Sequence, residues 1–407
     1  TMAYILIVNP LMLADTGMDF GGVFTATALS AMIATLVMAL YAKYPFALAP
    51  GMGLNAFFAY TVVLGEMGMS WQFALTAVLL EGIIFILLSF VNAREAIFNA
   101  IPANLKLAVS VGIGLFIAFI GLQNAGIVLA NPETGVALGN LKDPATLLAI
   151  IGIVVTGVLV ARDVKGGLLF GILITTVIGI PMGVTVLPQG AWVSLPPSVK
   201  DVAFKFVSFK EIFSFEMLVA VFTFLFVDIF DTVGTLAGVA SKADMLDENG
   251  ELPGVSKALM ADAVGTIAGA CLGTSTVTTF VESASGVAEG GRTGLTSLTT
   301  AGLFGLALFF APVFTMVPGA ATAPALVIVG LFMMSSVTEI DFTDMTEAIP
   351  AFLTIIMMPF AYSIAEGIVF GMVSYVLIKV FTGKHKDVSL VMYILGLVFL
   401  IRVLFFI

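Results

Sequence analysis

Apolar runs separated by short polar loops recur along all 407 residues, and this repetition limits the possible fold more than any single motif does. A helix needs about 20 mostly apolar residues to cross a bilayer. The alternating pattern of about ten residues that is typical of a transmembrane barrel does not occur. We therefore expect an all-α polytopic membrane protein with fourteen transmembrane segments. The predicted spans are 1–14, 20–42, 46–64, 71–91, 103–123, 144–162, 164–187, 214–240, 255–273, 276–290, 293–312, 322–338, 345–361 and 363–382.

The two ends of the chain are less clear than its middle. The sequence opens at Thr1 inside an apolar run without the basic region or cleavage site of a signal peptide, so we expect a first helix that lacks its beginning. A last apolar run, Val388–Ile407, contains Arg402 and follows a basic turn. This run is compatible with a further span or with a helix that lies at the membrane interface.

Composition and charge exclude several classes of function. The chain is 60% hydrophobic and only 10% charged, whereas soluble domains have about 25% charged residues. The net charge is −10, and no basic block suggests nucleic acid as a partner. Cys271 is the only cysteine and His385 the only histidine, so a structural zinc site or a Ser-His-Asp or Cys-His catalytic group is not expected. We expect no enzyme activity, no metal and no cofactor.

The distribution of basic residues predicts the orientation in the membrane. Basic residues collect on the cytoplasmic side of membrane proteins. With a cytoplasmic N-terminus and fourteen spans, eleven of the sixteen Lys and Arg residues fall on one side and four on the other, and Arg402 completes the count. We therefore place the N-terminus and the end of span 14 in the cytoplasm of a plasma (inner) membrane. Membrane lipids surround such a chain, and whether it forms a homodimer is open.

An internal repeat is visible between the seventh and fourteenth spans. The segment VKGGLLFGILITTVIGI from Val164 is similar to IAEGIVFGMVSYVLIKV from Ile364, and both contain Gly-x-x-Phe-Gly in the same register. The offset is 200 residues. An odd number of spans in each copy forces the two copies into opposite orientations, which is the inverted-repeat plan of secondary transporters.

Broken segments occur at corresponding points of the two halves. In ALAPGMGLNAFFAY, residues 47–60, one proline and two glycines precede Asn55. In GTSTVTTFVESASGVAEGG, residues 273–291, a Thr-rich run precedes Glu282. Each reads as a strand that leads into a half-helix. Irregular backbone at membrane depth is tolerated only where it is buried in protein or lines a cavity, so spans three and ten should meet near the midplane.

Two aspartates in the eighth span point to a substrate or ion path. Asp228 and Asp231 lie in FTFLFVDIFDTVGTLAG, which is otherwise apolar enough to cross a bilayer. Ionisable residues at membrane depth are costly and usually face such a path. Three residues apart on a helix, the two side chains lie close together, so at least one is expected to hold its proton near neutral pH. This pair predicts proton coupling, with Glu282 as a third carboxylate.

The same side chains suggest the class of ligand. A planar heterocycle with adjacent N–H groups suits a carboxylate acceptor, Asn55 offers a paired donor and acceptor, and Phe280 can stack on a ring. Alternatively, Asn55 satisfies backbone groups freed by the break, and Phe280 is packing. Glu81 and Asp262 also lie at membrane depth, and we expect them to support the broken segments from behind.

Four long motifs resemble one family along essentially the whole chain. APGMGLNAFFAY, FVDIFDTVGTLAGVA, TSTVTTFVESASGVAEGGRTGLT and EAIPAFLTIIMMPFAYSIAEGI are similar to the AzgA-like purine-permease branch of the nucleobase–cation symporter family. The resemblance implies two inverted repeats of seven spans each, which together form a core and a gate. It also implies proton-coupled uptake of purine bases. The implied boundaries are 1–100 for core spans 1–4, 101–190 for gate spans 5–7, 191–213 for a linker, 214–315 for core spans 8–11, 316–386 for gate spans 12–14 and 387–407 for the C-terminal apolar segment.

The resemblance also implies roles for particular residues. Asp231 and Glu282 take the acidic positions of spans eight and ten that contact the base. Asn55, Phe280 and Thr235 take further positions at the substrate, and Asp228 is the additional acid of this branch. Span eight lacks the histidine seen in uracil carriers, which leaves proton coupling to Asp228, Asp231 and Glu282.

Several functions remain open at this point. Guanine and hypoxanthine are favoured over adenine by overall resemblance alone. A carrier of the same architecture for uracil, xanthine or an anion is one alternative, and a passive channel is another. Two membrane aspartates also occur in intramembrane aspartyl proteases, but here both lie on one helix and no Gly-x-Gly-Asp sequence is present.

Overall fold

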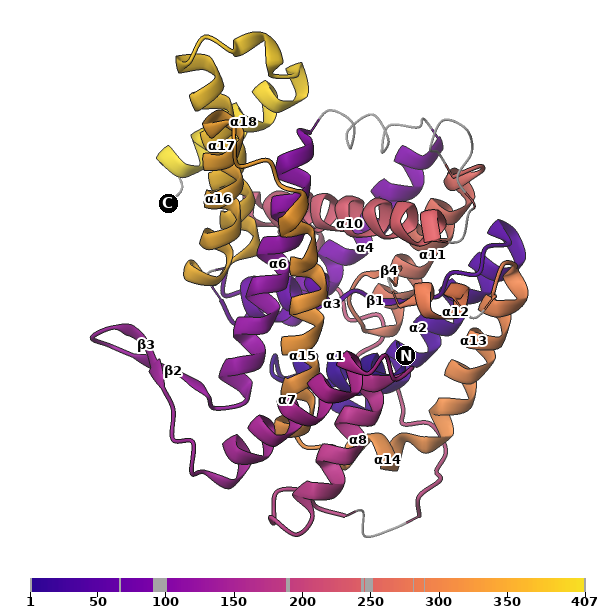
Figure 1. The fold of residues 1–407 in the computed structure, drawn as a ribbon. Helices are drawn as coiled ribbons and strands as arrows, with labels where there is room; N and C mark the ends of the chain where they lie inside the picture. Colours follow the sequence, from indigo (N-terminus) through magenta and orange to yellow (C-terminus); the bar gives the residue numbers. More distant parts are fainter. Residues whose placement is uncertain are drawn as a thin grey trace.

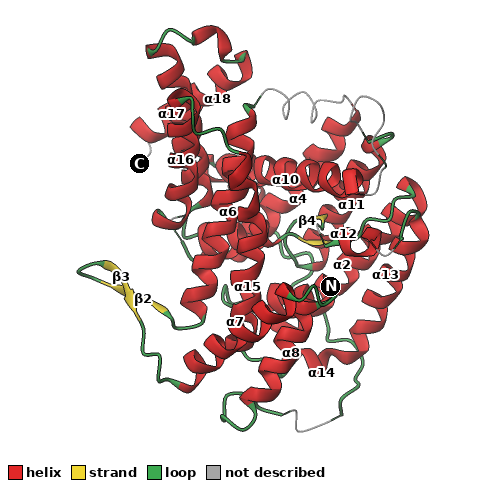
Figure 2. Ribbon diagram, in the orientation of Figure 1, coloured by secondary structure: helices red, strands yellow, loops and turns green. Residues whose placement is uncertain are grey.

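The computed structural model describes residues 2–65, 67–90, 101–187, 191–242, 245, 252–280, 282–288 and 290–405. Its secondary structure is predominantly helical, with four short strands in the described part of the chain (Figure 2). Among the described helices, seven have the length and apolar character needed to cross a membrane, and shorter apolar helices accompany them. The all-α membrane architecture is confirmed, and the number of crossings stays a prediction.

Helical segments coincide with all of the predicted spans. In the first half these are η1 Met2–Tyr4 with α1 Ile5–Ala14, α2 Phe20–Val37 with η2 Met38–Ala42, β1 Leu48–Pro50 with α3 Met52–Ala56 and η3 Phe57–Val63, α4 Trp71–Phe90, α6 Ala103–Asn124, α7 Pro144–Ala161 and α8 Gly167–Gly179. In the second half they are α10 Phe215–Lys242, α11 Val255–Leu272, β4 Val277–Thr279 with α12 Ser283–Ala288, α13 Gly294–Ala307 with η4 Leu308–Phe310 and α14 Ala311–Thr315, α15 Gly319–Met334 with η5 Ser335–Glu339, α16 Met345–Phe360 and α17 Ile364–Phe381.

Helix starts follow from local sequence. Asp19 precedes α2 and accepts a hydrogen bond from the Gly22 amide at 2.6 Å. Asp143 does the same for α7, where a proline occupies the first turn. Thr293 and Ser363 cap α13 and α17. Such side chains satisfy amides that a helix leaves unpaired at its first turn, so the short loops fix where the apolar helices begin.

Three segments differ from or extend the sequence predictions. Helix α8 ends at Gly179, although we predicted a span to residue 187, because Pro181 and Gly183, with a φ of 72°, turn the chain there. A hairpin that was not predicted, β2 Val128–Asn131 and β3 Gly135–Leu138, projects from the body between α6 and α7 (Figure 1). The final apolar run forms α18, Leu390–Phe405, preceded by η6 His385–Asp387, and α9 Phe209–Ile212 lies in the predicted linker.

The two broken segments meet in an antiparallel pair. Strand β1 pairs with β4, with Leu48 opposite Thr279 and Pro50 opposite Val277. The two strands lie at the centre of the molecule in Figure 1, between α2 and α10. Beyond β1, the Gly51 amide donates to the Thr276 carbonyl at 3.0 Å. The predicted plan of a strand followed by a half-helix in each half is confirmed.

Helix packing follows the same pattern in the two halves. Helix α6 packs against α15 and α16, and α15 correspondingly packs against α6 and α7. The hairpin of α7 and α8 corresponds to that of α16 and α17, and the contact of α2 with α13 corresponds to that of α4 with α11. This correspondence is consistent with the two repeats of seven spans predicted from the sequence.

The repeated glycines pack in equivalent places. A Cβ atom at Gly171 on α8 would clash with Thr156 on α7, and one at Gly371 on α17 would clash with Thr354 on α16. In membranes, small residues allow such close approach of helix backbones. The Gly-x-x-Phe-Gly register thus reflects the same hairpin packing in both copies.

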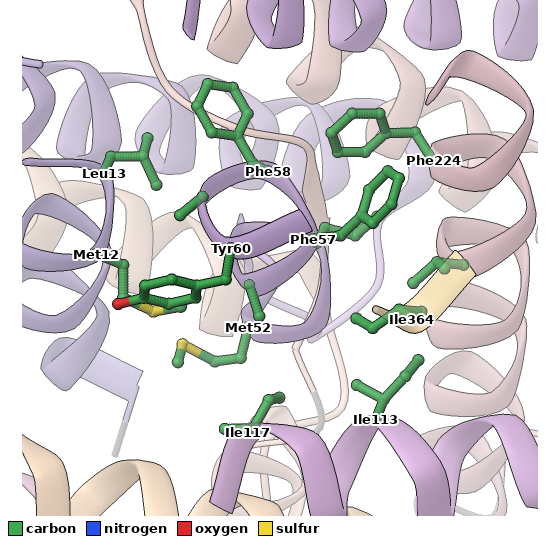
Figure 3. Packing of buried hydrophobic residues seen from close by; sticks show 14 of the residues in the cluster. Met12, Leu13, Met52, Phe57, Phe58, Tyr60, Ile113, Ile117, Phe224 and Ile364 are labelled. Atoms are coloured by element: carbon green, nitrogen blue, oxygen red, sulfur yellow. The ribbon is translucent and has the colours of Figure 1, made fainter. Parts of the chain in front are cut away.

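The half-helix α3 and its continuation η3 are held by apolar packing from several helices. Figure 3 shows Phe57 beside Phe224 of α10, and their ring centroids lie 4.7 Å apart at 76°. Ile113 and Ile117 of α6 approach from another side, and Met12 of α1 from a third. Because α3 is short, it has few backbone hydrogen bonds of its own. Contacts from three directions keep it in place.

The crossing of α6 and α15 provides a stability prediction. A Cβ atom at Gly330 would lie 2.8 Å from the Ala118 Cβ and 2.9 Å from its amide nitrogen. Overpacking of this kind costs about 1–3 kcal/mol, so Gly330→Ala should lower the melting temperature of the purified protein. Gly302→Ala on α13 is the control, because no atom lies within 4 Å there. Equal melting temperatures for the two variants would contradict this packing.

Candidate functional site

A narrow cavity lies where the strand pair, α10 and α15 approach one another. Its volume is about 50 Å³. Small-molecule sites commonly have about 300–1,000 Å³, so the elements around this cavity must move apart before it can admit a two-ring base. Its lining combines two acids with apolar, aromatic and small residues from both halves of the chain. The lining residues are Tyr4, Gly51, Met52, Gly53, Asp231, Thr235, Thr279, Phe280, Glu282, Val329 and Met333.

The two acids reach the cavity from different elements. Asp231 comes from α10, and Glu282 stands just before α12. Glu282 accepts a hydrogen bond from the Tyr4 hydroxyl at 2.8 Å. A Cβ atom at Gly51 would clash with Thr278 Cγ2 and would lie 3.2 Å from Asp231 Oδ2, so the glycine lets the end of β1 approach both β4 and this carboxylate. The structure therefore brings together the carboxylates of spans eight and ten, as the sequence predicts.

Aromatic rings flank Glu282. Phe280 and Tyr4 both line the cavity, and their ring centroids lie 6.4 Å apart with planes inclined at 47°. Thr235 follows Asp231 by four residues on α10 and so lies one turn further along the same helix face. Of the predicted substrate-binding residues, Asp231, Glu282, Phe280 and Thr235 all line this cavity.

Asp228 lies behind the cavity rather than in its wall. It is fully buried and accepts a hydrogen bond at 2.9 Å from Thr232, one turn along α10. The Thr232 hydroxyl also lies 2.6 Å from that of Thr278 on β4 and 3.2 Å from both carboxylate oxygens of Asp262 on α11. Two buried acids thus join the eighth span to the strand of the tenth.

Glu81 supports the broken segment from the other side. It is buried on α4 and accepts a hydrogen bond from Thr276 at 2.6 Å, one residue before β4. Together with Asp262, this acid holds the extended chain that carries Phe280 and Glu282. These contacts fit the supporting role that we expected for Glu81 and Asp262.

Asn55 lies in the junction between the broken segments and outside the cavity lining. It is fully buried, accepts a hydrogen bond from the Ser275 hydroxyl, and its amide approaches the Pro50 carbonyl at 3.4 Å. These contacts match the alternative that Asn55 satisfies backbone groups freed by the break. Its contact with a substrate stays a prediction.

Sequence reasoning missed three contributions to the cavity. Tyr4 lies in an ordinary apolar run, and only the fold brings it to Glu282. Val329 and Met333 lie one turn apart on α15 and supply an apolar part of the wall. Thr279 belongs to the Thr-rich run, and the pairing of β4 with β1 decides that it reaches the cavity.

Tyr4 offers a direct test of the cavity. Tyr4→Phe keeps the ring and removes the hydroxyl that fixes the Glu282 carboxylate, so ligand affinity should fall about tenfold, the value of one hydrogen bond to a charged group. Tyr393→Phe is the control, because its hydroxyl donates to the His385 carbonyl outside this region. Unchanged affinity in Tyr4→Phe, measured by ligand-induced thermal stabilisation, would show that this hydrogen bond does not position Glu282.

Comparison with known proteins identifies the family of the chain. Residues 1–400 match the model of a family described as the permease family. The chain belongs to this permease family. A guanine/hypoxanthine permease of Bacillus subtilis is 47% identical over 414 residues, which cover 100% of this permease and 94% of the relative. An adenine permease of Escherichia coli is 42% identical over 405 residues, covering 100% and 90% of the two chains. These relatives are transport proteins rather than enzymes.

Solved structures share the fold of this permease. The transmembrane domain of the cyanobacterial bicarbonate transporter BicA matches with a TM-score of 0.64 at 18% identity, covering 89% of this permease and 94% of that chain. The murine anion transporter Slc26a9 matches with a TM-score of 0.63 at 12% identity, covering 93% of this permease and 66% of that chain. At these identities the match concerns architecture alone.

Proposed function

We propose that this permease imports purine bases together with protons, with guanine and hypoxanthine as the favoured cargo. The observation that carries the proposal is the convergence of Asp231 and Glu282 on one cavity between the two broken segments. The names of the guanine/hypoxanthine and adenine relatives support a purine as the ligand.

The chemistry of the cavity suits a neutral heterocycle. A carboxylate can accept two hydrogen bonds from adjacent N–H groups, each worth about 1.5–3 kcal/mol. Phe280 and Tyr4 offer ring faces for a planar ligand, at a separation typical of aromatic contacts. An anion would be repelled by Asp231 and Glu282, so the bicarbonate and anion cargoes named for the structural neighbours do not fit this pocket.

The buried acids supply the coupling to protons. Asp231 faces the cavity, while Asp228 lies one turn behind it in contact with Thr232. Two carboxylates held close together in a poorly solvated site favour a shared proton. In our proposal Asp231 and Glu282 bind the base, and the proton is carried by Asp228 or by one of these two acids.

Transport requires the cavity to open alternately to each side. Val329 and Met333 of α15 border the cavity opposite the acids of α10 and the strand pair. We assign residues 1–100 and 214–315 to a core that carries the acids, and residues 101–190 and 316–386 to a gate that carries α15. Movement of the core against the gate then exposes the base in turn to the outside and to the cytoplasm of a plasma membrane.

Uptake into cells that lack their own purine carriers tests this proposal. Radiolabelled hypoxanthine, guanine and adenine should accumulate against a gradient, and a proton uncoupler should abolish accumulation. If unlabelled uracil, xanthine or bicarbonate inhibits this uptake more strongly than unlabelled purines do, the cargo is a different one. Entry that is insensitive to the uncoupler and never exceeds equilibrium would indicate a passive channel and would overturn the proposal.

A further inference from the structure

Tyr60 connects the ends of two helices that lie far apart in the sequence. It belongs to η3, is 5% exposed, and donates a hydrogen bond to Asp15 Oδ2 at 2.8 Å. Asp15 follows directly after α1, and Figure 3 shows the Tyr60 ring on the side of Met12 of the same helix. Asn124, the last residue of α6, donates from its side-chain amide to the Tyr60 hydroxyl at 3.4 Å. One hydroxyl therefore joins the end of α1 to the end of α6.

Tyr362 contacts the same ring from the turn between α16 and α17. The rings of Tyr60 and Tyr362 meet edge to face, with centroids 6.4 Å apart and planes inclined at 79°. Phe116 and Phe119 of α6 contact the Tyr362 ring in the same manner, at 5.3 and 6.2 Å. Edge-to-face pairs at such separations are attractive. The tyrosine junction formed in this way consists of Asp15, Tyr60, Asn124 and Tyr362.

The backbone at Tyr362 shows that a side chain is kept at a place where glycine is usual. Its φ is 52°, in the left-handed region. The Ser363 amide donates to the Met358 carbonyl at 2.9 Å and closes the end of α16. Helices commonly end on a residue in this conformation, and that residue is usually glycine, because a Cβ atom is unfavourable there. The ring contacts of Tyr362 offset this backbone cost.

The tyrosine junction lies on the outward side of the cavity in the orientation predicted from Lys and Arg. Its four members stand at or just beyond the outward ends of spans one, three, five and thirteen. Tyr60 lies about two helical turns beyond the cavity residue Met52 along α3 and η3. Tyr4, near the start of span one, and Thr235, near the end of span eight, line the cavity from the cytoplasmic direction. The junction is therefore placed between the cavity and the outside.

We propose that the tyrosine junction is a latch that joins the core to the gate on the outward side and is closed in this structure. The inference rests on the proposed function, because it uses the core and gate assigned there. Asp15 and Tyr60 belong to the core, whereas Asn124 and Tyr362 belong to the gate. When the core moves against the gate, Tyr60 keeps Asp15 and leaves Asn124 and Tyr362. One long hydrogen bond and one ring pair are modest contacts, so the latch can open in each transport cycle.

Thiol labelling from each side of the membrane tests the latch. Cys271, the only native cysteine, is replaced by serine, and Met52→Cys places a reporter thiol in the cavity. A membrane-impermeant maleimide is applied to intact cells and, separately, to inverted membrane vesicles. Tyr60→Phe keeps the ring and removes the hydroxyl. It should be labelled about two- to tenfold faster than its parent from outside, the value of one hydrogen bond, and more slowly from the cytoplasmic side.

Tyr362→Gly is a second variant that preserves the turn. Glycine suits a φ of 52° better than tyrosine, so α16 should end at the same place while the ring contact with Tyr60 is lost. The same opposite changes on the two sides are expected. Tyr393→Phe is the matched control, because its hydroxyl donates to the His385 carbonyl at 2.9 Å, and both labelling rates should stay unchanged.

Opposite changes on the two sides separate a latch from a contact that only stabilises the fold. Loss of a merely structural contact would speed labelling from both sides and would overturn the inference. Unchanged rates in both Tyr60→Phe and Tyr362→Gly would overturn it as well. Faster labelling from the cytoplasmic side alone would place the junction at the wrong end of the path and refute an outward latch.

The labelling results are independent of the cargo. The maleimide reaction requires no purine, so opposite changes on the two sides would support the latch even if wild-type protein fails to accumulate purine bases. If wild-type protein accumulates hypoxanthine while the variants at Tyr60 and Tyr362 label like their parent, the proposed function stands and the latch alone is refuted.

Discussion

Glu282→Gln is expected to reduce uptake of hypoxanthine by at least about 100-fold. The glutamine side chain replaces one acceptor oxygen with an amino group that opposes an N–H donor of the base, and it removes the negative charge. The loss of one hydrogen bond to a charged acceptor, the weakening of the other and the opposition of two donors together cost about 3 kcal/mol or more, and each 1.4 kcal/mol is a factor of about ten. Initial uptake rates of radiolabelled hypoxanthine at matched membrane expression measure the effect.

A surface glutamate controls for the chemical change itself. Glu133 is exposed in the hairpin between β2 and β3, far in sequence from any residue of the cavity. Glu133→Gln should transport like wild type. Asp231→Asn should share the defect of Glu282→Gln, because both acids line the same cavity. Wild-type uptake by the variants at Asp231 and Glu282 would show that this cavity is not the substrate site.

Asp228→Asn is expected to abolish accumulation while leaving base binding within about threefold of wild type. Asp228 does not line the cavity, so its replacement removes no contact with a bound base. Asparagine still accepts a hydrogen bond from Thr232, but it cannot take up or release a proton. Proteoliposomes with an imposed pH gradient, compared with ligand-induced thermal stabilisation, measure the two properties separately.

A surface aspartate controls for the chemical change in Asp228→Asn. Asp201→Asn changes an exposed aspartate in the loop before α9 and should preserve both binding and accumulation. Accumulation by Asp228→Asn that still depends on the pH gradient would exclude Asp228 from proton coupling. The proton would then have to be carried by Asp231 or Glu282 alone.

The central features of the fold were predictable because each leaves a strong local signal. Glycine and proline next to Asn55, and the β-branched run before Glu282, predict extended chain that leads into a half-helix, and the pairing of Leu48 with Thr279 confirms it. Acids in an apolar span are costly enough to predict a buried polar site. Asp231 and Glu282 accordingly meet at the cavity.

Other features depend on tertiary contacts that no local pattern records. The spacing of Asp228 and Asp231 predicts proximity, but only the packing of α10 decides that Asp231 faces the cavity while Asp228 bonds Thr232. Tyr4 has no polar neighbours in sequence and acquires its role from contact with Glu282.

Segment ends illustrate a competition between hydropathy and backbone geometry. Hydropathy continues beyond Gly179, but Pro181 and Gly183 end α8 there, so the seventh span is shorter than predicted. Arg94, one of the basic residues counted for the orientation, lies outside the described residues. The assignment of orientation therefore still depends on the distribution of Lys and Arg along the sequence.

The most direct test of the central claim is an experimental structure of the purified permease with hypoxanthine bound. The account predicts a base against the ring of Phe280, with N–H groups directed at Asp231 or Glu282. A base bound elsewhere, with these two carboxylates turned away from it, would contradict the site on which the proposed transport mechanism depends.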